Sequence, residues 1–312
     1  MRTTDRLPSK LRKVLGEKIG DVRGAVRVHG EAAAIGLDSL WSVAGFPKEP
    51  LIDVLDMFSG CGGMSAGFRA INGRVPIFRV GAGLDIDDVA LDTYRKNVGA
   101  ETVNADVSRL SKAPDELRTL LRGVGIGRRP LVLIGCSPCQ GFSSHRNGSG
   151  QDDGRNSLFL DFAKLAIDLN PDVIVVENVP EMISDRYWPL VDAFRKRIES
   201  AGYYLNLSVH NLAEFAVPQE RFRALLVAMK KPFLPLRGFL SRENFRTVRS
   251  AIGHLTPIEA GEPDVVDPMH YTVGHRESTL ATIRQVPKNG GSRPFHAGPE
   301  CLRRAEARQG KP

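Results

Sequence analysis

The sequence predicts an α/β protein built on a mostly parallel, doubly wound β-sheet with helices on both faces. Short apolar runs with the length of buried strands alternate along the chain with segments of helical periodicity. Hydrophobic residues make up 42% and charged residues 25% of the 312 residues, a composition typical of a globular protein with a core. No apolar run approaches the roughly 18 residues that span a bilayer. These observations exclude a disordered chain, a coiled coil and a membrane-spanning protein.

The alternation between residues 51 and 229 supplies the individual elements. Runs such as 131–135 and 173–176 have the length of buried strands, and apolar positions at helical spacing mark the helices between them. Ligands of such a sheet bind at the carboxyl ends of its strands, so the residues that follow each strand are the candidate site. We expect strands at 51–58, 78–86, 130–135, 171–178, 203–212 and 223–229, and helices at 64–71, 87–97 and 156–169.

The chain is expected to have three parts: a basic N-terminal extension over 1–50, a domain over 51–232, and an irregular segment over 233–312. The formal net charge of +7 belongs to the tails, because residues 1–30 hold eight basic and three acidic residues and residues 301–312 hold four basic and one acidic residue. Basic tails suit a polyanion such as nucleic acid, but solvated termini explain them equally well. Four cysteines are too few for a disulfide scaffold, and the N-terminus lacks an apolar signal region, so a cytoplasmic location is expected.

A glycine-rich turn follows the first expected strand and reads Asp56-Met57-Phe58-Ser59-Gly60-Cys61-Gly62-Gly63. Its glycines allow a ligand to approach the backbone, and the helix after it offers free N–H groups, although a tight connection alone would also explain it. Asp85 ends the next expected strand at the spacing of an acid that binds a ribose hydroxyl, and Asp106 is placed similarly at the end of a third strand. Either acid could instead be a helix N-cap. Together the three features predict a nucleoside cofactor.

The segment Cys136-Ser137-Pro138-Cys139 follows another expected strand, and three interpretations compete for it. Half of a zinc site is disfavoured because no second cysteine or histidine pair follows. A thioredoxin-like pair is the second interpretation. The third is a lone catalytic nucleophile, Cys139, beside the glycine-rich polar loop 141–155, which has the composition of a mobile lid.

Charged residues at the ends of two further strands complete the candidates. Glu177 ends the strand expected at 171–178, where a carboxylate is costly to bury unless it is partnered or protonated. We therefore favour a proton donor over a helix cap at this position. Arg221 and Arg223 alternate, which places them on one face of a strand, where paired guanidiniums suit phosphate or carboxylate groups. A solvated strand edge is the alternative.

Taken together, these residues resemble the motifs of the DNA (cytosine-5) methyltransferase family. The resemblance extends over residues 51–229 and keeps the order of the family's motifs. Met57 stands where the family usually has leucine, and Asp85 stands where it more often has glutamate. The matching segments are DMFSGCGG (56–63), GLDIDDVALDTYRKN (83–97), NADV (104–107), Pro138-Cys139-Gln140, Glu177-Asn178-Val179 and Gln219-x-Arg221-x-Arg223.

The resemblance implies a Rossmann-like AdoMet-dependent methyltransferase fold, S-adenosyl-L-methionine as the cofactor, and double-stranded DNA as the substrate, in a restriction-modification system. No metal and no membrane contact are implied, and in a bacterium the protein would associate with the nucleoid. Catalytic roles fall on Cys139, Gln140, Glu177, Arg221 and Arg223. The implied cofactor-binding residues are Asp56, Phe58, Ser59, Gly60, Cys61, Gly62, Gly63, Asp85, Ile86, Asp106, Val107, Pro138 and Leu158.

The chemistry implied by the family explains these residue types. The Cys139 thiolate attacks C6 of cytosine, so that C5 becomes nucleophilic enough to take the methyl group. Glu177 holds the base edge and gives a proton to N3, while Arg221 orients it or stabilises charge at O2. The target must leave the duplex, with the segment 141–155 closing over it and Arg155 as a candidate phosphate contact. Cys136 is then structural.

The sequence departs from the family after residue 232. Family members continue into a target recognition domain and two last motifs, whereas the segment 246–264 here resembles the approach to that domain, and the chain ends at Pro312, where the domain should begin. The fold is therefore expected to be C-terminally incomplete, completed by a second polypeptide or left impaired by truncation. An inactive or partner-dependent AdoMet-fold subunit and a tRNA cytosine-5 methyltransferase are the alternative functions, with an oxidoreductase using the two cysteines a distant third.

Overall fold

The structure is a computed structural model that describes residues 50–72, 77–137, 155–287, 293–294 and 297–298. The chain divides into two compact units, Met1–Gly253 and His254–Pro312. The boundary that we predict after residue 232 stays a prediction. None of the helices in the described residues is long and apolar enough to cross a membrane.

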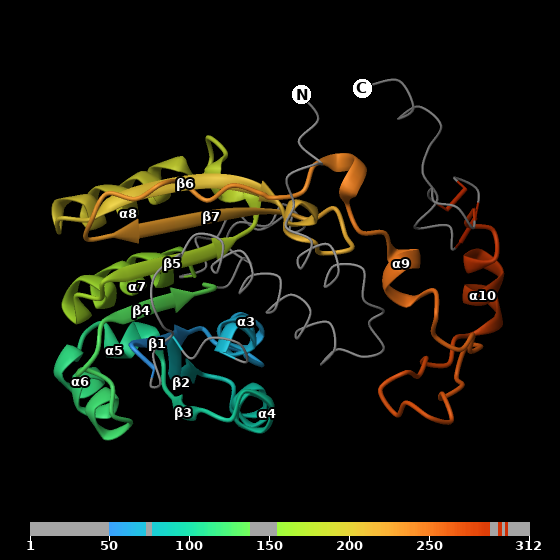
Figure 1. Ribbon diagram of the computed structural model, residues 1–312, viewed down its shortest axis with the longest axis horizontal. Helices are drawn as coiled ribbons and strands as arrows, with labels where there is room; N and C mark the ends of the chain where they lie inside the picture. Colours follow the sequence, from blue (N-terminus) through green and yellow to red (C-terminus); the bar gives the residue numbers. More distant parts are fainter. Residues whose placement is uncertain (1–49, 73–76, 138–154, 288–292, 295–296, 299–312) are drawn as a thin grey trace, which may run out of the picture. The chain divides into compact units, whose positions relative to one another are not determined.

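A seven-stranded sheet in the order β3-β2-β1-β4-β5-β7-β6 forms the centre of the first unit (Figure 1). The first five strands in this order are mutually parallel, and β7 runs antiparallel to both of its neighbours. This arrangement confirms the predicted mostly parallel α/β fold. The strands are β1 (Ile52–Met57), β2 (Phe78–Asp85), β3 (Glu101–Asn104), β4 (Leu131–Gly135), β5 (Val173–Asn178), β6 (Tyr204–Asn211) and β7 (Phe222–Met229).

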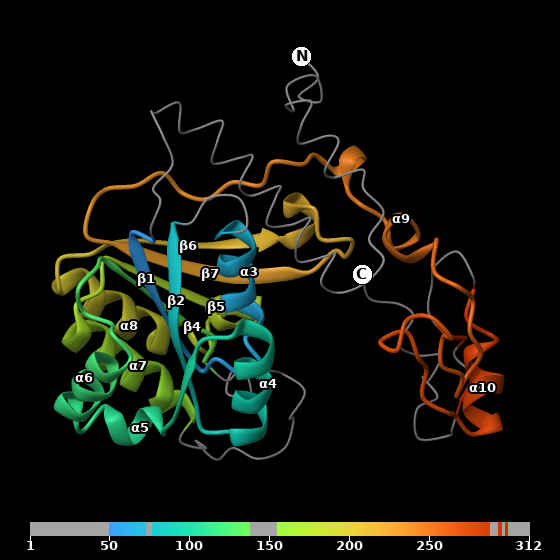
Figure 2. The same cartoon turned by 60° about the horizontal axis from the view of Figure 1, so that its bottom comes forward.

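Helices cover both faces of this sheet, as Figures 1 and 2 show: α3 and α4 lie on one side, and α5 to α8 lie on the other. Every residue of β4 is buried because helices cover it from both sides, and this produces the continuous apolar sequence of the strand. The helices of this unit are α3 (Gly63–Asn72), α4 (Asp88–Val98), α5 (Val107–Leu110), α6 (Pro114–Gly123), α7 (Arg155–Leu169), α8 (Trp188–Ser200) and α9 (Val248–Ile252), with 3-10 turns η3 (Pro180–Ile183), η4 (Leu212–Phe215) and η5 (Arg242–Asn244).

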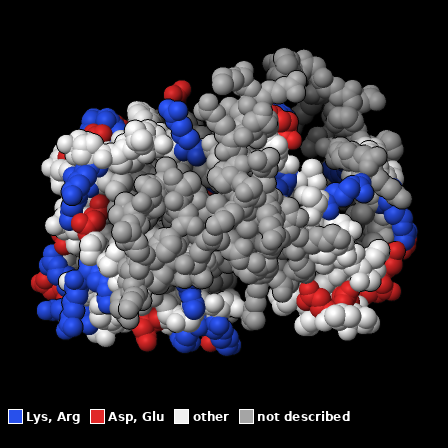
Figure 3. Space-filling model, viewed as in Figure 1, with Lys and Arg blue, Asp and Glu red and all other residues white. Residues whose placement is uncertain are grey.

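Two apolar layers pack against the sheet. The larger one joins β-strand residues to α5–α8, with the Phe159 and Phe194 rings stacked at 4.3 Å between centroids. The smaller one places Val54, Val132 and Ile134 under α3. On the outer surface over α6 and α8, basic and acidic side chains alternate (Figure 3), in pairs such as Arg118 with Asp115. Arg118 and Arg195 on this side are therefore paired with acidic neighbours.

The second unit contains a tight reversal over residues 259–273 and the helix α10 (Glu277–Ile283). Pro263 and Tyr271 form an antiparallel bridge, and Thr272 Oγ1 donates a hydrogen bond of 2.6 Å to the carbonyl of Glu259. The Asp264 carboxylate accepts hydrogen bonds from backbone N–H groups of the turn, which hold its pKa below the usual value. This unit lies within the predicted irregular segment.

Candidate active site

The predicted motif residues gather at one edge of the sheet. Asp85 ends β2, the glycine-rich turn follows β1, Cys136 follows β4, and Glu177 is near the end of β5. These four strands are adjacent and parallel in the order β2-β1-β4-β5, so their carboxyl ends meet at the same edge (Figure 2). This is the position at which open α/β sheets bind ligands.

The turn after β1 has a backbone that only glycine adopts easily. Gly60 and Gly62 have φ of 48° and 90°, in the left-handed region. A Cβ atom on Gly62 would lie 2.5 Å from Val98 Cγ2 and 2.7 Å from the Tyr94 ring, so that position is closed by α4. A Cβ atom on Gly60 would meet nothing within 4 Å. The turn therefore packs tightly against the protein at Gly62 and leaves open space at Gly60.

Asp85 connects β2 to this turn. Its Oδ2 accepts a hydrogen bond of 2.8 Å from the backbone N–H of Gly60, and its Oδ1 accepts one of 3.0 Å from Asp87 N. Asp85 is not the cap of α4, because Asp87 has that role and accepts from Val89 N and Ala90 N. A carboxylate has about four acceptor sites, so Asp85 retains capacity for ligand hydroxyls.

Asp106 is a helix cap in the structure. It precedes α5 in an extended conformation and accepts a hydrogen bond of 2.8 Å from Ser108 N. The strand before it, β3, ends at Asn104, two residues earlier than we expected. Its predicted contact with a cofactor stays a prediction. Among the other predicted cofactor residues, Val107 is buried, Leu158 is half-buried, and Ile86 and Cys61 are exposed.

The residues around the turn fit a nucleoside cofactor. The Ser59 hydroxyl is buried without a hydrogen-bond partner among the described residues, which is costly unless a ligand supplies one. It lies beside the open space at Gly60 and the N-terminus of α3, a ten-residue helix. An unsatisfied hydroxyl, a carboxylate with spare acceptor sites and open space thus occur together.

Asp56 belongs to a chain of three hydrogen-bonded side chains beneath the turn. Its side chain is buried, and its Oδ2 accepts a hydrogen bond of 2.7 Å from Ser65 Oγ, which lies 2.9 Å from the hydroxyl of Tyr94. Burial, together with the nearby charge of Asp85, raises the pKa of Asp56 to about 7. The chain of three side chains joins β1 to α3 and α4. Its role toward a cofactor stays a prediction.

At the carboxyl end of β5, Glu177 is paired with an arginine. Arg223 Nε lies 2.7 Å from Glu177 Oε1, and the two side chains are 17% and 31% exposed. Burial of the Glu177 carboxylate is therefore incomplete, and its partner is a fixed cation. Arg221 precedes β7, is exposed, and donates through its backbone N–H to Asn211 Oδ1. Arg223 thus pairs with Glu177, and the predicted catalytic role of Arg221 stays a prediction.

Cys136 and Asn178 occupy the space between the turn and Glu177. Asn178 Nδ2 donates to both the carbonyl and the hydroxyl oxygen of Ser137, at 3.2 Å, and so ties β5 to the segment after β4. Burial and the neighbouring Glu177 carboxylate raise the pKa of the Cys136 thiol well above its usual value. Cys136 is therefore a neutral thiol. In the part of the chain that the structure describes, no group of three histidine, cysteine or acidic side chains is arranged to hold a metal ion.

Comparison with known proteins identifies the family. Residues 52–260 match the family model of the C-5 cytosine-specific DNA methylases. The chain belongs to this family. The finding confirms the resemblance that the motifs indicated.

Similar proteins include two curated type II enzymes. The chain is 30% identical over 238 residues to the type II methylase M.HgiDII of Herpetosiphon aurantiacus, a match that covers 76% of this chain and 64% of the relative. It is 32% identical over 252 residues to the type II methyltransferase M1.HphI of Haemophilus parahaemolyticus, covering 80% and 64%. The crystal structure of the S. pombe Dnmt2 methyltransferase has a TM-score of 0.45 and 24% identity, covering 58% of this chain and 52% of that one. The chain thus spans less than two thirds of the length of the curated relatives it matches.

Part of the predicted site lies outside the described residues. The structure does not describe Pro138, Cys139, Gln140 or most of the segment 141–155. The structure also shows two residues that sequence reasoning missed, Ser65 and Tyr94. The sequence signal for Tyr94 was its place among the buried residues of α4, beside Leu91 and Val98. A buried tyrosine hydroxyl needs a hydrogen-bond partner, so this residue indicated a polar contact inside the protein.

Proposed function

We propose that this chain provides the cofactor-binding and catalytic part of a DNA (cytosine-5) methyltransferase that methylates C5 of a flipped-out cytosine. One observation carries the proposal: the glycine-rich turn, the Cys136–Ser137 segment and the Glu177–Arg223 pair stand at the carboxyl ends of three adjacent parallel strands. The type II names of the two relatives support a restriction-modification system. We assign the catalytic domain to 51–232 and the approach to target recognition to 233–312.

We assign the cofactor site to the turn after β1, with S-adenosyl-L-methionine supplying a methyl group on a sulfonium. The N–H group of Gly63 at the start of α3 and the Ser59 hydroxyl would hold the amino acid part, and Asp85 the ribose. The Tyr94 ring packs against the turn and stabilises its conformation, because the ring occupies the position that a side chain at residue 62 would take.

In the proposed reaction the Cys139 sulfur bonds to C6 of cytosine, and the electron pair of the C5–C6 double bond moves toward C5, which takes the methyl group. A base then removes the C5 proton and the thiolate leaves. Glu177 gives a proton to N3 as the ring gains electrons, and N3 returns this proton to Glu177 when the thiolate leaves. Arg223, at 2.7 Å, orients the Glu177 carboxyl group and keeps one of its oxygens in place.

Target recognition is assigned to sequence beyond this match, on the same or a second polypeptide. The matched region corresponds to 64% of each of the two relatives, and the remainder of those proteins has no counterpart in the alignment. Contacts to base edges specify a DNA sequence, and we assign those contacts to the recognition part. The described part alone should therefore bind DNA mainly through contacts to the phosphate backbone of the DNA.

The proposal is tested by transfer of a tritiated methyl group to mixed-sequence duplex DNA and, in parallel, to tRNA. We expect weak or no transfer by the 312-residue chain, and transfer to DNA when a polypeptide with the family's recognition domain and last two motifs is added. Transfer to tRNA alone, or no transfer in any arm, contradicts the proposal. Robust, site-specific transfer by the chain alone would instead place a recognition element within 233–312.

Cofactor binding can be measured without DNA. We expect Asp85→Ala to weaken S-adenosyl-L-methionine binding by roughly 1.5–3 kcal/mol in a calorimetric titration, since a charge-assisted hydrogen bond is lost. Gly60→Val should weaken it further by filling the open space at the turn. Asp87→Ala is the matched control, because that carboxylate caps α4 and should affect helix stability rather than affinity. Unchanged affinity in both the Asp85 and Gly60 variants would rule out this site.

A further inference from the structure

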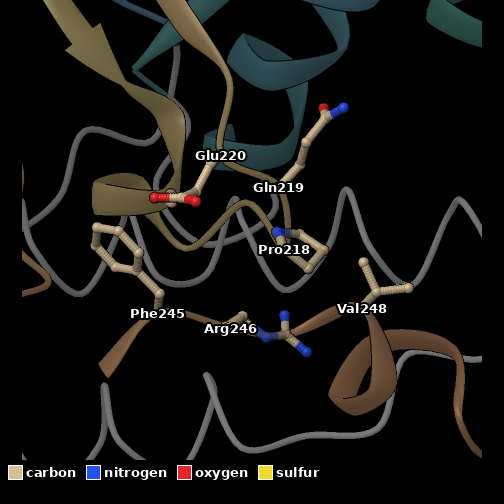
Figure 4. Close-up of a pocket in the computed structure, with 7 residues that line it drawn as sticks. Pro218, Gln219, Glu220, Phe245, Arg246 and Val248 are labelled. Atoms are coloured by element: carbon tan, nitrogen blue, oxygen red, sulfur yellow. The ribbon is translucent and has the colours of Figure 1, made fainter. Parts of the chain in front are cut away.

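A pocket of about 480 Å³ lies on the first unit, outside the site described above (Figure 4). It is formed by the segment that leads from η4 into β7 and by the segment between η5 and α9. Its volume falls within the range of pockets that take a small-molecule-sized group, roughly 300–1,000 Å³. The lining residues are Ala213, Pro218, Gln219, Glu220, Phe245, Arg246 and Val248.

Arg246 is the notable charge in this pocket. Its Nη1 is buried and has no hydrogen-bond partner among the residues that the structure describes. The side chain is partly buried, and this burial lowers its pKa below the usual value without neutralising it. A desolvated guanidinium with donors left over is costly, and an anionic acceptor removes that cost.

The acidic residue in the pocket does not supply that acceptor. Glu220 Oε1 lies 3.6 Å from Arg242 Nη2, so the two charges offset each other. Figure 4 shows the Glu220 carboxylate on the Phe245 side of the pocket, whereas the Arg246 guanidinium lies below Pro218 and points toward the Val248 side. Among the residues that the structure describes, the Arg246 charge therefore has no counter-charge, and apolar walls and the ring of Phe245 lie beside it.

We propose that this pocket receives a phosphate group of the DNA backbone, with Arg246 donating to its oxygens and Pro218 and Phe245 packing against the attached deoxyribose or base. A planar guanidinium suits the phosphate geometry, and apolar or aromatic walls suit the flanking sugar and base. The inference rests on the proposed function in that DNA is the substrate. It deepens that function by assigning a DNA contact to the segment 245–248, which follows the last motif found in this chain, Gln219-x-Arg221-x-Arg223.

The test is equilibrium binding of a fluorescent duplex oligonucleotide, without cofactor, over a series of salt concentrations. We expect Arg246→Gln to weaken binding about tenfold and to reduce the slope of log K against log salt by about 0.9, the value for one phosphate contact. Arg249→Gln is the matched control, since Arg249 is exposed on α9 and its loss is the same change of charge. It should leave the slope nearly unchanged.

A second variant gives the opposite sign. Glu220→Gln removes the negative charge of the pocket and should strengthen binding. If Arg246→Gln does not fold, this variant still tests the assignment. Equal losses in the Arg246 and Arg249 variants would indicate general electrostatics and overturn it, as would absence of DNA binding by the unaltered chain. Inorganic phosphate could bind at Arg246 while the Arg246→Gln change leaves the slope of log K against log salt for DNA binding unaltered. This result would reassign the pocket to a free phosphate ligand and overturn the DNA assignment. Because no methyl transfer is measured, these outcomes are separate from failure of the proposed function.

Discussion

Cys139→Ser should lose methyl transfer by at least about 10⁴-fold, whereas Cys136→Ser should retain most of it. The nucleophile in such a reaction is a thiolate, and the fraction of thiolate is set by the pKa of the cysteine. At Cys136, burial and the Glu177 carboxylate both raise that pKa, so its thiol stays protonated at neutral pH. Cys139 lies outside the described residues, and it is the remaining cysteine of the segment after β4.

The measurement is capture of a covalent protein–DNA adduct on a denaturing gel. Duplex DNA in which 5-fluorocytosine replaces cytosine should trap the enzyme, because fluorine at C5 cannot leave as a proton does. The complete enzyme, including the recognition part, is used for both variants. An adduct that persists in Cys139→Ser and disappears in Cys136→Ser would exchange the roles of the two residues.

The second large effect concerns Asp56 and the dependence of stability on pH. The pKa of Asp56 is about 7 in the folded protein, against 3.8 for an aspartate that is exposed to water. Between these values the folded state holds a proton that the unfolded state has released, so rising pH favours unfolding. The stabilisation is fully present below about pH 4 and is lost as pH passes about 7. The expected loss is roughly 4 kcal/mol from this group.

Urea titrations at several pH values between 4 and 8 measure this contribution. Asp56→Asn keeps the shape of the side chain and cannot titrate, so its free energy of unfolding should depend less on pH than that of the unaltered protein. Ser65→Ala removes a hydrogen bond that favours the charged carboxylate, and it should move the transition to higher pH. Parallel pH profiles for the unaltered protein and Asp56→Asn would show that Asp56 does not titrate in this range.

The strands and the location of the site could be predicted from sequence because both depend on local patterns. A run such as Leu131–Gly135 is buried on both faces, and its apolar residues show this directly. The helices α6 and α8 were not predicted, since their buried residues, for example Leu117 and Leu121, are separated by charged ones. The short strand β3 was anticipated only from the acid that follows it.

Contacts between side chains depend on register, which no local pattern contains. Alternation placed Arg221 and Arg223 on one strand face, but β7 begins at Phe222. Glu177 is paired with Leu225, and Arg223 lies two residues from Leu225 on the same face, so it becomes the diagonal neighbour of Glu177. Similarly, the Asp56–Ser65–Tyr94 chain brings together residues of three elements, and it depends on how α3 and α4 pack on the sheet.

Tyr94 has a consequence for how this site can vary. A Cβ atom at Gly83, like one at Gly62, would lie within 2.8 Å of its ring, so one aromatic side chain fills the space that two glycines leave. Positions 83 and 94 should therefore change together, because a smaller residue at 94 would admit alanine at 83. Gly62 stays fixed in either case, since Val98 and its φ of 90° also exclude a side chain there. Directed evolution of this turn should randomise the codons for 83 and 94 together and leave the codon for 62 unchanged.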